Sequence, residues 1–254
     1  MSLSPPQFLD GPNGRIAYRQ RNGAKNAGKP GVVWLGGFRS DMIGTKATFV
    51  DEWAKHHEAA FLRFDYSGHG ESDGVFEDGC IGDWFADALA AFDALTTGPQ
   101  ILIGSSMGAW IATLLAKARP NRIASIIYIA PAPDFTERLM WPAFTDEQRE
   151  TMLRDGRIEQ PSDYSDEPEV LTLKLIEDGR NHLVMTQTVP ITCPVRILQG
   201  VKDDAVPWRH AVDFADMIET DDVEISLKKA GDHRLSEPDD LARLREALDA
   251  LYSG

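Results

Sequence analysis

The sequence predicts an α/β fold with a mostly parallel sheet, and three observations lead to this prediction. Short apolar runs alternate with amphipathic stretches of helical length, which is the pattern of strands joined by helices. Two of these runs, 100–104 and 123–129, are almost wholly apolar, as strands covered on both faces must be. The 254 residues, 43% hydrophobic and 26% charged, have ordinary globular composition and fit a single domain spanning 1–254.

The expected strands and helices follow from this alternation. Seven strands are expected, at 15–20, 31–35, 59–64, 100–104, 123–129, 195–199 and 223–228. Before Gly98, one helical face carries Trp84, Phe85, Ala88, Leu89, Phe92 and Leu95. Near the C-terminus a second helix has the same spacing, with Leu241, Leu244, Leu248 and Leu251 on one face.

The segment 135–193 interrupts the alternation. It contains no good strand, two helix-like pieces at 145–153 and 170–178, and an acidic segment bounded by Pro161 and Pro168. A bare loop of this length is uncommon in a compact domain. We therefore expect a helical cap insertion over one edge of the sheet.

Composition excludes several classes of protein and partner. Forty acidic residues against 26 basic ones give a formal charge of −14, which disfavours nucleic-acid binding. Two cysteines, Cys80 and Cys193, cannot form a disulfide framework. The N-terminal sequence has no secretion signal or mitochondrial presequence pattern, and no apolar run is long enough to span a membrane. These features predict a cytoplasmic protein; its oligomeric state stays open.

The strongest chemical signal is Gly104-Ser105-Ser106-Met107-Gly108, between an apolar strand and a helical pattern. A sharp strand-to-helix turn leaves no room for side chains beside its central residue, and a glycine at each end satisfies that demand. The turn exposes Ser106 at the carboxyl edge of the sheet, beside the positive end of a helix dipole. Ser106 is therefore the predicted nucleophile, while a purely structural turn is the alternative.

A serine nucleophile needs a base and an acid that orients the base, in the chain order serine, acid, histidine. His233 follows the strand 223–228 and is the predicted base. Asp203 and Asp204 both follow the strand 195–199, and the spacing from Gly200 favours Asp203. Asp232, next to the histidine in sequence, is a weaker candidate for the acid.

The remaining histidines fit the role of base less well. We expect solvent exposure at His56 and His57, a glycine-rich turn at His69, a place in the insertion for His182 and a surface position for His210.

Main-chain N–H groups are the expected donors to the oxyanion. One is Met107, directly after the nucleophile, and the other is Phe38, after the glycine pair 36–37 that follows the strand 31–35. An ordinary β-to-α turn is the alternative at Phe38. Leu139, Met140, Trp141 and Phe144 could line an acyl pocket or simply pack onto the core.

Neither a cofactor motif nor a metal motif is present. The glycines at 68, 70 and 74 miss the dinucleotide-binding spacing by one residue. No cluster of histidine, cysteine or acidic residues has metal-ligand spacing. The predicted chemistry therefore needs no cofactor.

Taken together, these motifs resemble the α/β-hydrolase superfamily. Five strings, at 37–47, 63–68, 98–102, 202–208 and 232–234, are similar in the same order to a mitochondrial branch that hydrolyses palmitoyl-protein thioesters and acyl glucuronides. The resemblance implies an eight-stranded, mostly parallel sheet and a triad of Ser106, Asp203 and His233. The chain differs in lacking a mitochondrial presequence, in Gln199 where histidine is common, and in Ala109 after the turn.

The expected activity is that of a serine esterase or thioesterase that acts on small-molecule or acyl-protein esters. A carbon–carbon hydrolase or a perhydrolase would use the same triad and is the alternative among enzymes. A ligand-binding homologue without turnover is the alternative from another class.

Overall fold

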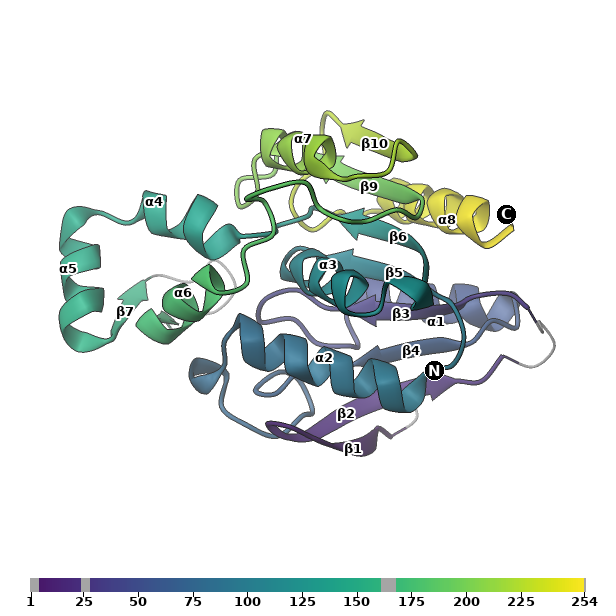
Figure 1. Cartoon of the computed structure of the whole chain (residues 1–254), viewed down its shortest axis with the longest axis horizontal. Helices are drawn as coiled ribbons and strands as arrows, with labels where there is room; N and C mark the ends of the chain where they lie inside the picture. The colour runs from purple at the N-terminus through teal and green to yellow at the C-terminus, as the bar shows by residue number, and fades with distance from the viewer. Residues whose placement is uncertain (1–4, 24–27, 161–167, 254) are drawn as a thin grey trace.

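An eight-stranded sheet forms the centre of the molecule (Figure 1), in the order β1-β2-β4-β3-β5-β6-β9-β10. The computed structural model describes residues 5–23, 28–160 and 168–253. Of the described strands of this sheet, β1 and β2 are antiparallel to their neighbours and the other pairs are parallel. The strands are β1 (Gln7–Gly11), β2 (Gly14–Arg21), β3 (Gly31–Leu35), β4 (Phe61–Phe64), β5 (Gln100–Ser105), β6 (Ile123–Ile129), β9 (Val195–Gly200) and β10 (Val223–Lys228).

The predicted strands agree with the structure apart from their ends and one omission. β3, β6 and β10 have the expected bounds, and β4 begins at Phe61, two residues later than expected. The omission is β1, an edge strand in which no residue is fully buried. Its side chains therefore lack the apolar pattern that reveals a core strand.

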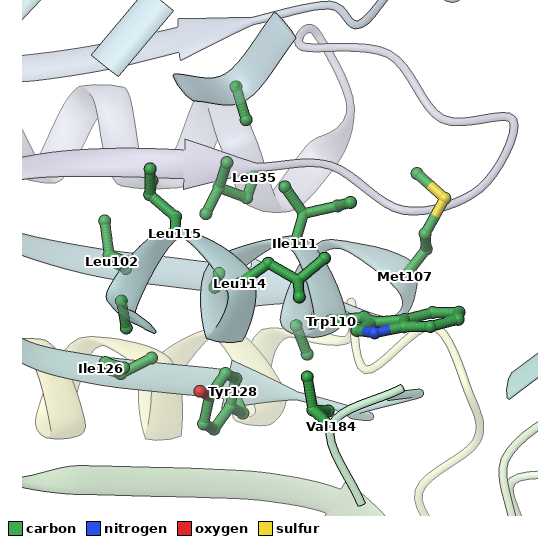
Figure 2. Close-up of a cluster of buried hydrophobic side chains, with 14 of the residues drawn as sticks. Leu35, Leu102, Met107, Trp110, Ile111, Leu114, Leu115, Ile126, Tyr128 and Val184 are labelled. Carbon is green, nitrogen blue, oxygen red and sulfur yellow. The ribbon is translucent and has the colours of Figure 1, made fainter. Parts of the chain in front are cut away.

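Helices cover both faces of the sheet and form two hydrophobic cores. One core contains side chains of α2 (Ile81–Leu95), α3 (Met107–Ala118) and α7 (Trp208–Met217). The other contains side chains of α1 (Thr45–His56) and α8 (Pro238–Ser253). Figure 2 shows α3 in the first core, with Trp110, Ile111 and Leu114 among side chains from β3, β5 and β6. Single 3₁₀ turns lie at η1 (Phe76–Asp78) and η2 (Pro120–Arg122).

Of the expected insertion 135–193, Val184, Met185, Val189 and Ile191 pack into the first core, whereas residues 136–160 and 168–180 form a small lobe beside one end of the sheet (Figure 1). It contains a π-helical turn η3 (Thr136–Met140), α4 (Trp141–Ala143), α5 (Asp146–Asp155), β7 (Arg157–Gln160), β8 (Glu169–Thr172) and α6 (Leu173–Arg180). The lobe has its own apolar cluster, made of Phe144, Met152, Ile158, Leu171 and Ile176.

The prediction of no strand in this segment is wrong. β7 and β8 pair antiparallel, and Val170, expected in a helix, lies in β8. Each strand has only four residues and buries only one of them, so the sequence pattern is weak. Of the acidic segment 161–168, residues 161–167 lie outside the described residues.

A buried carboxylate joins the two ends of this lobe. Asp134 accepts hydrogen bonds from the main-chain N–H groups of Val184 (2.8 Å) and Met185 (2.7 Å). Its own carbonyl oxygen accepts from the N–H groups of Glu137 and Arg138. The start and the return of the lobe are thereby held at one point, and burial raises the pKa of Asp134.

Candidate active site

Ser106 lies in a sharp turn between β5 and α3, as the glycine spacing predicts. Its backbone has φ 55° and ψ −118°, a conformation that residues other than glycine rarely adopt. A Cβ on Gly104 would lie 2.5 Å from the carbonyl oxygen of Gly108, and one on Gly108 would lie 2.1 Å from that of Leu35. Both glycines are therefore required by close backbone contacts, which hold the turn against the end of β3.

Ser106, His233 and Asp203 form a continuous hydrogen-bonded series. The Nε2 atom of His233 lies 3.0 Å from Ser106 Oγ, and its Nδ1 atom lies 2.8 Å from Asp203 Oδ2. All three residues follow carboxyl ends of parallel strands of the same sheet, β5, β9 and β10, with β6 between β5 and β9. The structure thus brings together the three predicted residues, which are far apart in sequence.

The loops that carry acid and base are pressed against each other. A Cβ on Gly200 would meet the carbonyl oxygens of Gly231 at 2.4 Å and Asp232 at 2.5 Å. The N–H of Lys202 also donates to the carbonyl oxygen of Gly231 at 2.9 Å. This contact fixes the separation of Asp203 from the histidine loop.

Of the competing acids, only Asp203 contacts the imidazole. Asp204 is exposed, and the side chain of Asp232 accepts a hydrogen bond from the N–H of Leu235 instead. The prediction of Asp203 as the acid, in preference to Asp204 and Asp232, therefore agrees with the geometry.

Three donors besides His233 hold the Asp203 carboxylate, which is buried. The N–H groups of Ala205 and Val206 donate to Oδ1 at 3.0 and 2.7 Å, and Gln199 Nε2 donates to Oδ2 at 3.1 Å. In the sequence, Gln199 stands out only as a departure from the superfamily pattern. Its role here depends on a turn that returns the acid to the end of β9, which the sequence pattern does not reveal.

The two predicted oxyanion donors flank Ser106. A Cβ on Gly37 would lie only 3.4 Å from Ser106 Cβ, so the loop before Phe38 lies directly against the nucleophile. Within the described ranges, the main-chain N–H groups of Phe38 and Met107 donate no hydrogen bond. The Phe38 ring packs edge-on against the ring of Phe76, with ring centroids 4.8 Å apart.

Two cavities meet at Ser106, His233 and Phe38. The polar cavity, about 760 Å³, has five charged side chains in its lining, Arg39, Lys46, Glu77, Glu169 and Arg234, beside the apolar Phe38, Pro168 and Val170. The apolar cavity, about 380 Å³, is lined mainly by Ala132, Phe135, Leu139, Met140, Phe144 and Val206. Gln148, Gln160 and Glu169, the last shared with the polar cavity, complete one side of it. Three of the four residues expected at an acyl pocket thus line the apolar cavity. The fourth, Trp141, packs against Arg180, whose guanidinium carbon lies 5.0 Å from the centre of the Trp141 ring.

Two other histidines are buried and serve different purposes. His69 packs against Phe76 and Trp84, and burial lowers its pKa to about 4. The expected surface position of His210 is wrong, because it is buried and its Nε2 atom lies 2.9 Å from the carbonyl oxygen of Pro133. The chain entering the lobe covers this histidine, a contact across many residues that local sequence does not reveal.

The described residues contain neither a metal-binding cluster nor a membrane-spanning helix. No group of three or more histidine, cysteine or acidic residues there could hold a metal ion. No helix of the described chain is long and apolar enough to cross a bilayer.

Comparison with known sequences gives one family and several relatives. The model of the alpha/beta hydrolase family matches residues 32–244. The bovine protein named palmitoyl-protein thioesterase ABHD10, mitochondrial, is 38% identical over 96% of this chain and 79% of its own length. The human protein of the same name is 37% identical over 98% of this chain and 80% of its own length.

Solved structures show the same similarity. A putative hydrolase from Agrobacterium vitis S4 is 41% identical, with a TM-score of 0.93 over 97% of this chain and 98% of that one. The mouse alpha/beta hydrolase domain-containing protein 10 is 36% identical, with a TM-score of 0.89 over 98% of each chain. These matches confirm the predicted fold and the resemblance inferred from the five strings.

The expected cytoplasmic location is contradicted by these relatives. The bovine, mouse and human proteins all carry the word mitochondrial in their names. The expectation came from residue composition and from the absence of recognisable signals, neither of which carries positive information about a compartment.

Proposed function

Because this chain belongs to the alpha/beta hydrolase family, we propose that it is a serine hydrolase that cleaves carboxylic esters and thioesters through an acyl-enzyme intermediate. One observation carries the proposal, namely the hydrogen-bonded series from Asp203 through His233 to Ser106, with contacts of 2.8 and 3.0 Å. A serine hydroxyl becomes an effective nucleophile only when an oriented base accepts its proton.

In the proposed reaction His233 Nε2 removes the proton of Ser106 Oγ while Oγ attacks the substrate carbonyl carbon. The N–H groups of Phe38 and Met107 donate to the resulting oxyanion; losing one such donor typically lowers kcat about 100- to 1,000-fold. His233 then gives the proton to the leaving oxygen or sulfur as its bond to the acyl carbon breaks. His233 next removes a proton from water, whose oxygen attacks the acyl carbon of the acyl-enzyme. The bond between that carbon and Ser106 Oγ then breaks, and His233 gives the proton to Oγ.

Asp203 keeps the proton of the neutral imidazole on Nδ1 and stabilises the imidazolium that forms during each step. Its own position is set by Ala205, Val206 and Gln199. Every proton in the cycle is therefore transferred through His233, and the reaction uses only side chains, main-chain N–H groups and water.

Long-chain acyl thioesters are the proposed substrates, and acyl glucuronides are a second candidate class. The relatives from cattle and humans are named palmitoyl-protein thioesterases, and the apolar cavity at Ser106 offers a place for an acyl chain. We further propose that 135–193 acts as a cap, since Leu139, Met140 and Phe144 of this segment line that cavity.

The proposal is tested by labelling with a fluorophosphonate probe and by an ester and thioester panel. The wild-type protein should be labelled and should hydrolyse p-nitrophenyl esters and coenzyme A thioesters, with rates that depend on acyl length. Ser106→Ala should lose both labelling and hydrolysis. Ser125→Ala, at a buried hydroxyl with no hydrogen-bond partner in the described chain, is the matched control.

Two outcomes would overturn the proposal. Folded wild-type protein that is not labelled would favour a ligand-binding homologue. Labelling with no hydrolysis of any ester or thioester, but turnover of a carbon–carbon bond or of peroxide, would favour the alternative enzymes.

A further inference from the structure

The two cavities at Ser106 differ in chemistry, and a bound ester must use both. The scissile carbonyl lies at Ser106, so its acyl group and its leaving group extend in different directions. The apolar cavity presents hydrocarbon side chains such as Leu139, Met140 and Phe144. The polar cavity contains Lys46, from α1, together with ionic side chains of the lobe and of the loops around it.

Most of the charge in the polar cavity is already paired. Arg39 forms ion pairs with Glu77 and Glu169, each with an N···O distance of 3.2 Å, and its guanidinium group lies over the ring of Phe76. The positive charge of Arg39 is therefore already balanced within the cavity wall, where its two carboxylate partners leave one negative charge in excess.

Lys46 is different, because no carboxylate of the described residues forms an ion pair with it. Its Nζ atom donates to the carbonyl oxygen of Arg234, the residue after the catalytic histidine, which leaves two further protons on the ammonium group. The side chain is half-buried, and burial lowers its pKa to about 8 despite the more distant carboxylates of Asp232 and Asp240. At pH 7 the group therefore remains mostly protonated.

The position of Lys46 does not stabilise the helix that carries it. Lys46 lies in the first turn of α1, where the helix dipole disfavours a positive charge. That turn has no acidic residue and no side-chain cap to compensate. A cation here, in the same cavity as Ser106 and His233, is better explained by an anion that binds in the cavity.

Resting on the proposed hydrolase function, we infer that the acyl group of the substrate occupies the apolar cavity and that Lys46 binds a negatively charged group on the leaving group. The ammonium group forms a charge-assisted hydrogen bond with this anion. Lys46 is thus a specificity residue for the leaving group, and the acyl chain does not contact it.

Two chromogenic esters with the same butyryl group test the inference. One is 5-butyryloxy-2-nitrobenzoate, whose leaving group carries a carboxylate, and the other is the neutral 5-butyryloxy-2-nitrobenzamide. The wild-type protein should prefer the anionic ester in kcat/KM by about tenfold, as expected for one hydrogen bond to a charged group. Lys46→Met should abolish this preference, and Lys46→Arg should retain it.

Lys55→Met is the matched control, because it removes the same charge from the exposed end of the same helix. It should keep the preference. Leu139→Trp should lower kcat/KM for long acyl chains and leave the ratio between the two butyryl esters unchanged. Lys55→Met should react with the fluorophosphonate probe as the wild type does, and labelling of the other three variants should show that Ser106 remains reactive in each of them.

The inference fails if the labelled wild-type protein has no preference, if the preference survives in Lys46→Met, or if Lys55→Met loses it equally. It also fails if Leu139→Trp changes the leaving-group ratio rather than the acyl-length dependence. A wild-type protein that is not labelled at all would instead refute the proposed hydrolase function, so the two failures are distinguishable.

Discussion

Asparagine in place of Asp203 keeps the shape of the side chain but changes one carboxylate oxygen to an NH₂ group. The hydrogen-bond donors around the side chain decide which of the two oxygens is replaced. The N–H groups of Ala205 and Val206 donate to Oδ1 at 3.0 and 2.7 Å. The single oxygen of asparagine must therefore stay at that position. The NH₂ group then replaces Oδ2, the atom that lies 2.8 Å from His233 Nδ1.

This orientation reverses the imidazole. An NH₂ group donates to Nδ1, so the ring carries its proton on Nε2 and can no longer accept the proton of Ser106. The NH₂ group also faces the donor Nε2 of Gln199, which lies 3.1 Å from Oδ2 in the native protein. In serine proteases the same change lowers kcat about 10⁴-fold, and we expect a loss of that size for Asp203→Asn.

The assay is kcat with saturating p-nitrophenyl butyrate at pH 7, with urea unfolding to establish that the variant is folded. Asp204→Asn is the matched control, since this neighbouring carboxylate is exposed and does not contact His233. The reasoning is refuted if Asp203→Asn retains more than about a tenth of kcat, far above the loss expected for a reversed imidazole. A large loss in Asp204→Asn instead would assign the acid to the other aspartate.

Three further changes test the packing. Gly108→Ala places a Cβ 2.1 Å from the Leu35 carbonyl oxygen and should lower kcat/KM about 100-fold, whereas Gly44→Ala, with 3.6 Å to its nearest neighbour, should not. Burial lowers the pKa of His69 from 6.5 to about 4. Between these two pH values the imidazole is protonated in the unfolded chain but neutral in the folded protein. Stability to urea therefore falls by about 3 kcal/mol as pH drops through this range, and His69→Phe should flatten that dependence. Thr145→Ala removes the capping box of α5 and should cost about 1 kcal/mol in urea unfolding.

Each of these outcomes has a clear opposite. Equal activity of both glycine variants would mean that the close approach of α3 and β3 is not needed for catalysis. An unchanged acid dependence in the His69 variant would assign the sensitivity to another group. Unchanged stability without the cap would show that packing alone holds α5.

The proposed triad could be predicted from sequence because each member follows a predicted strand and because parallel strands end at one edge of the sheet. Ser106 had the additional signal of two glycines, which the close contacts of Gly104 and Gly108 explain. Local sequence pattern and overall fold agree at these positions, so the sequence alone was sufficient to predict these residues.

The remaining features depend on contacts that local sequence does not encode. Gln199 supports Asp203 across a turn, and His210 is covered by Pro133, distant in the chain. The hairpin of β7 and β8 has polar, four-residue strands, so it lacks the apolar alternation by which strands are recognised. The division into a polar and an apolar cavity arises only when the lobe packs beside Ser106.

The attachment of the lobe at Asp134 bears on how such a protein can diversify. Because one carboxylate ties the entering chain to the main chain of Val184 and Met185, the ends of the lobe remain together whatever lies between them. Closing a loop whose ends are already adjacent adds little entropy cost for each added residue. Insertions, deletions and grafted segments between these anchor points can thus alter which acyl groups are accepted, while the sheet and the loops that carry Ser106 and His233 remain undisturbed.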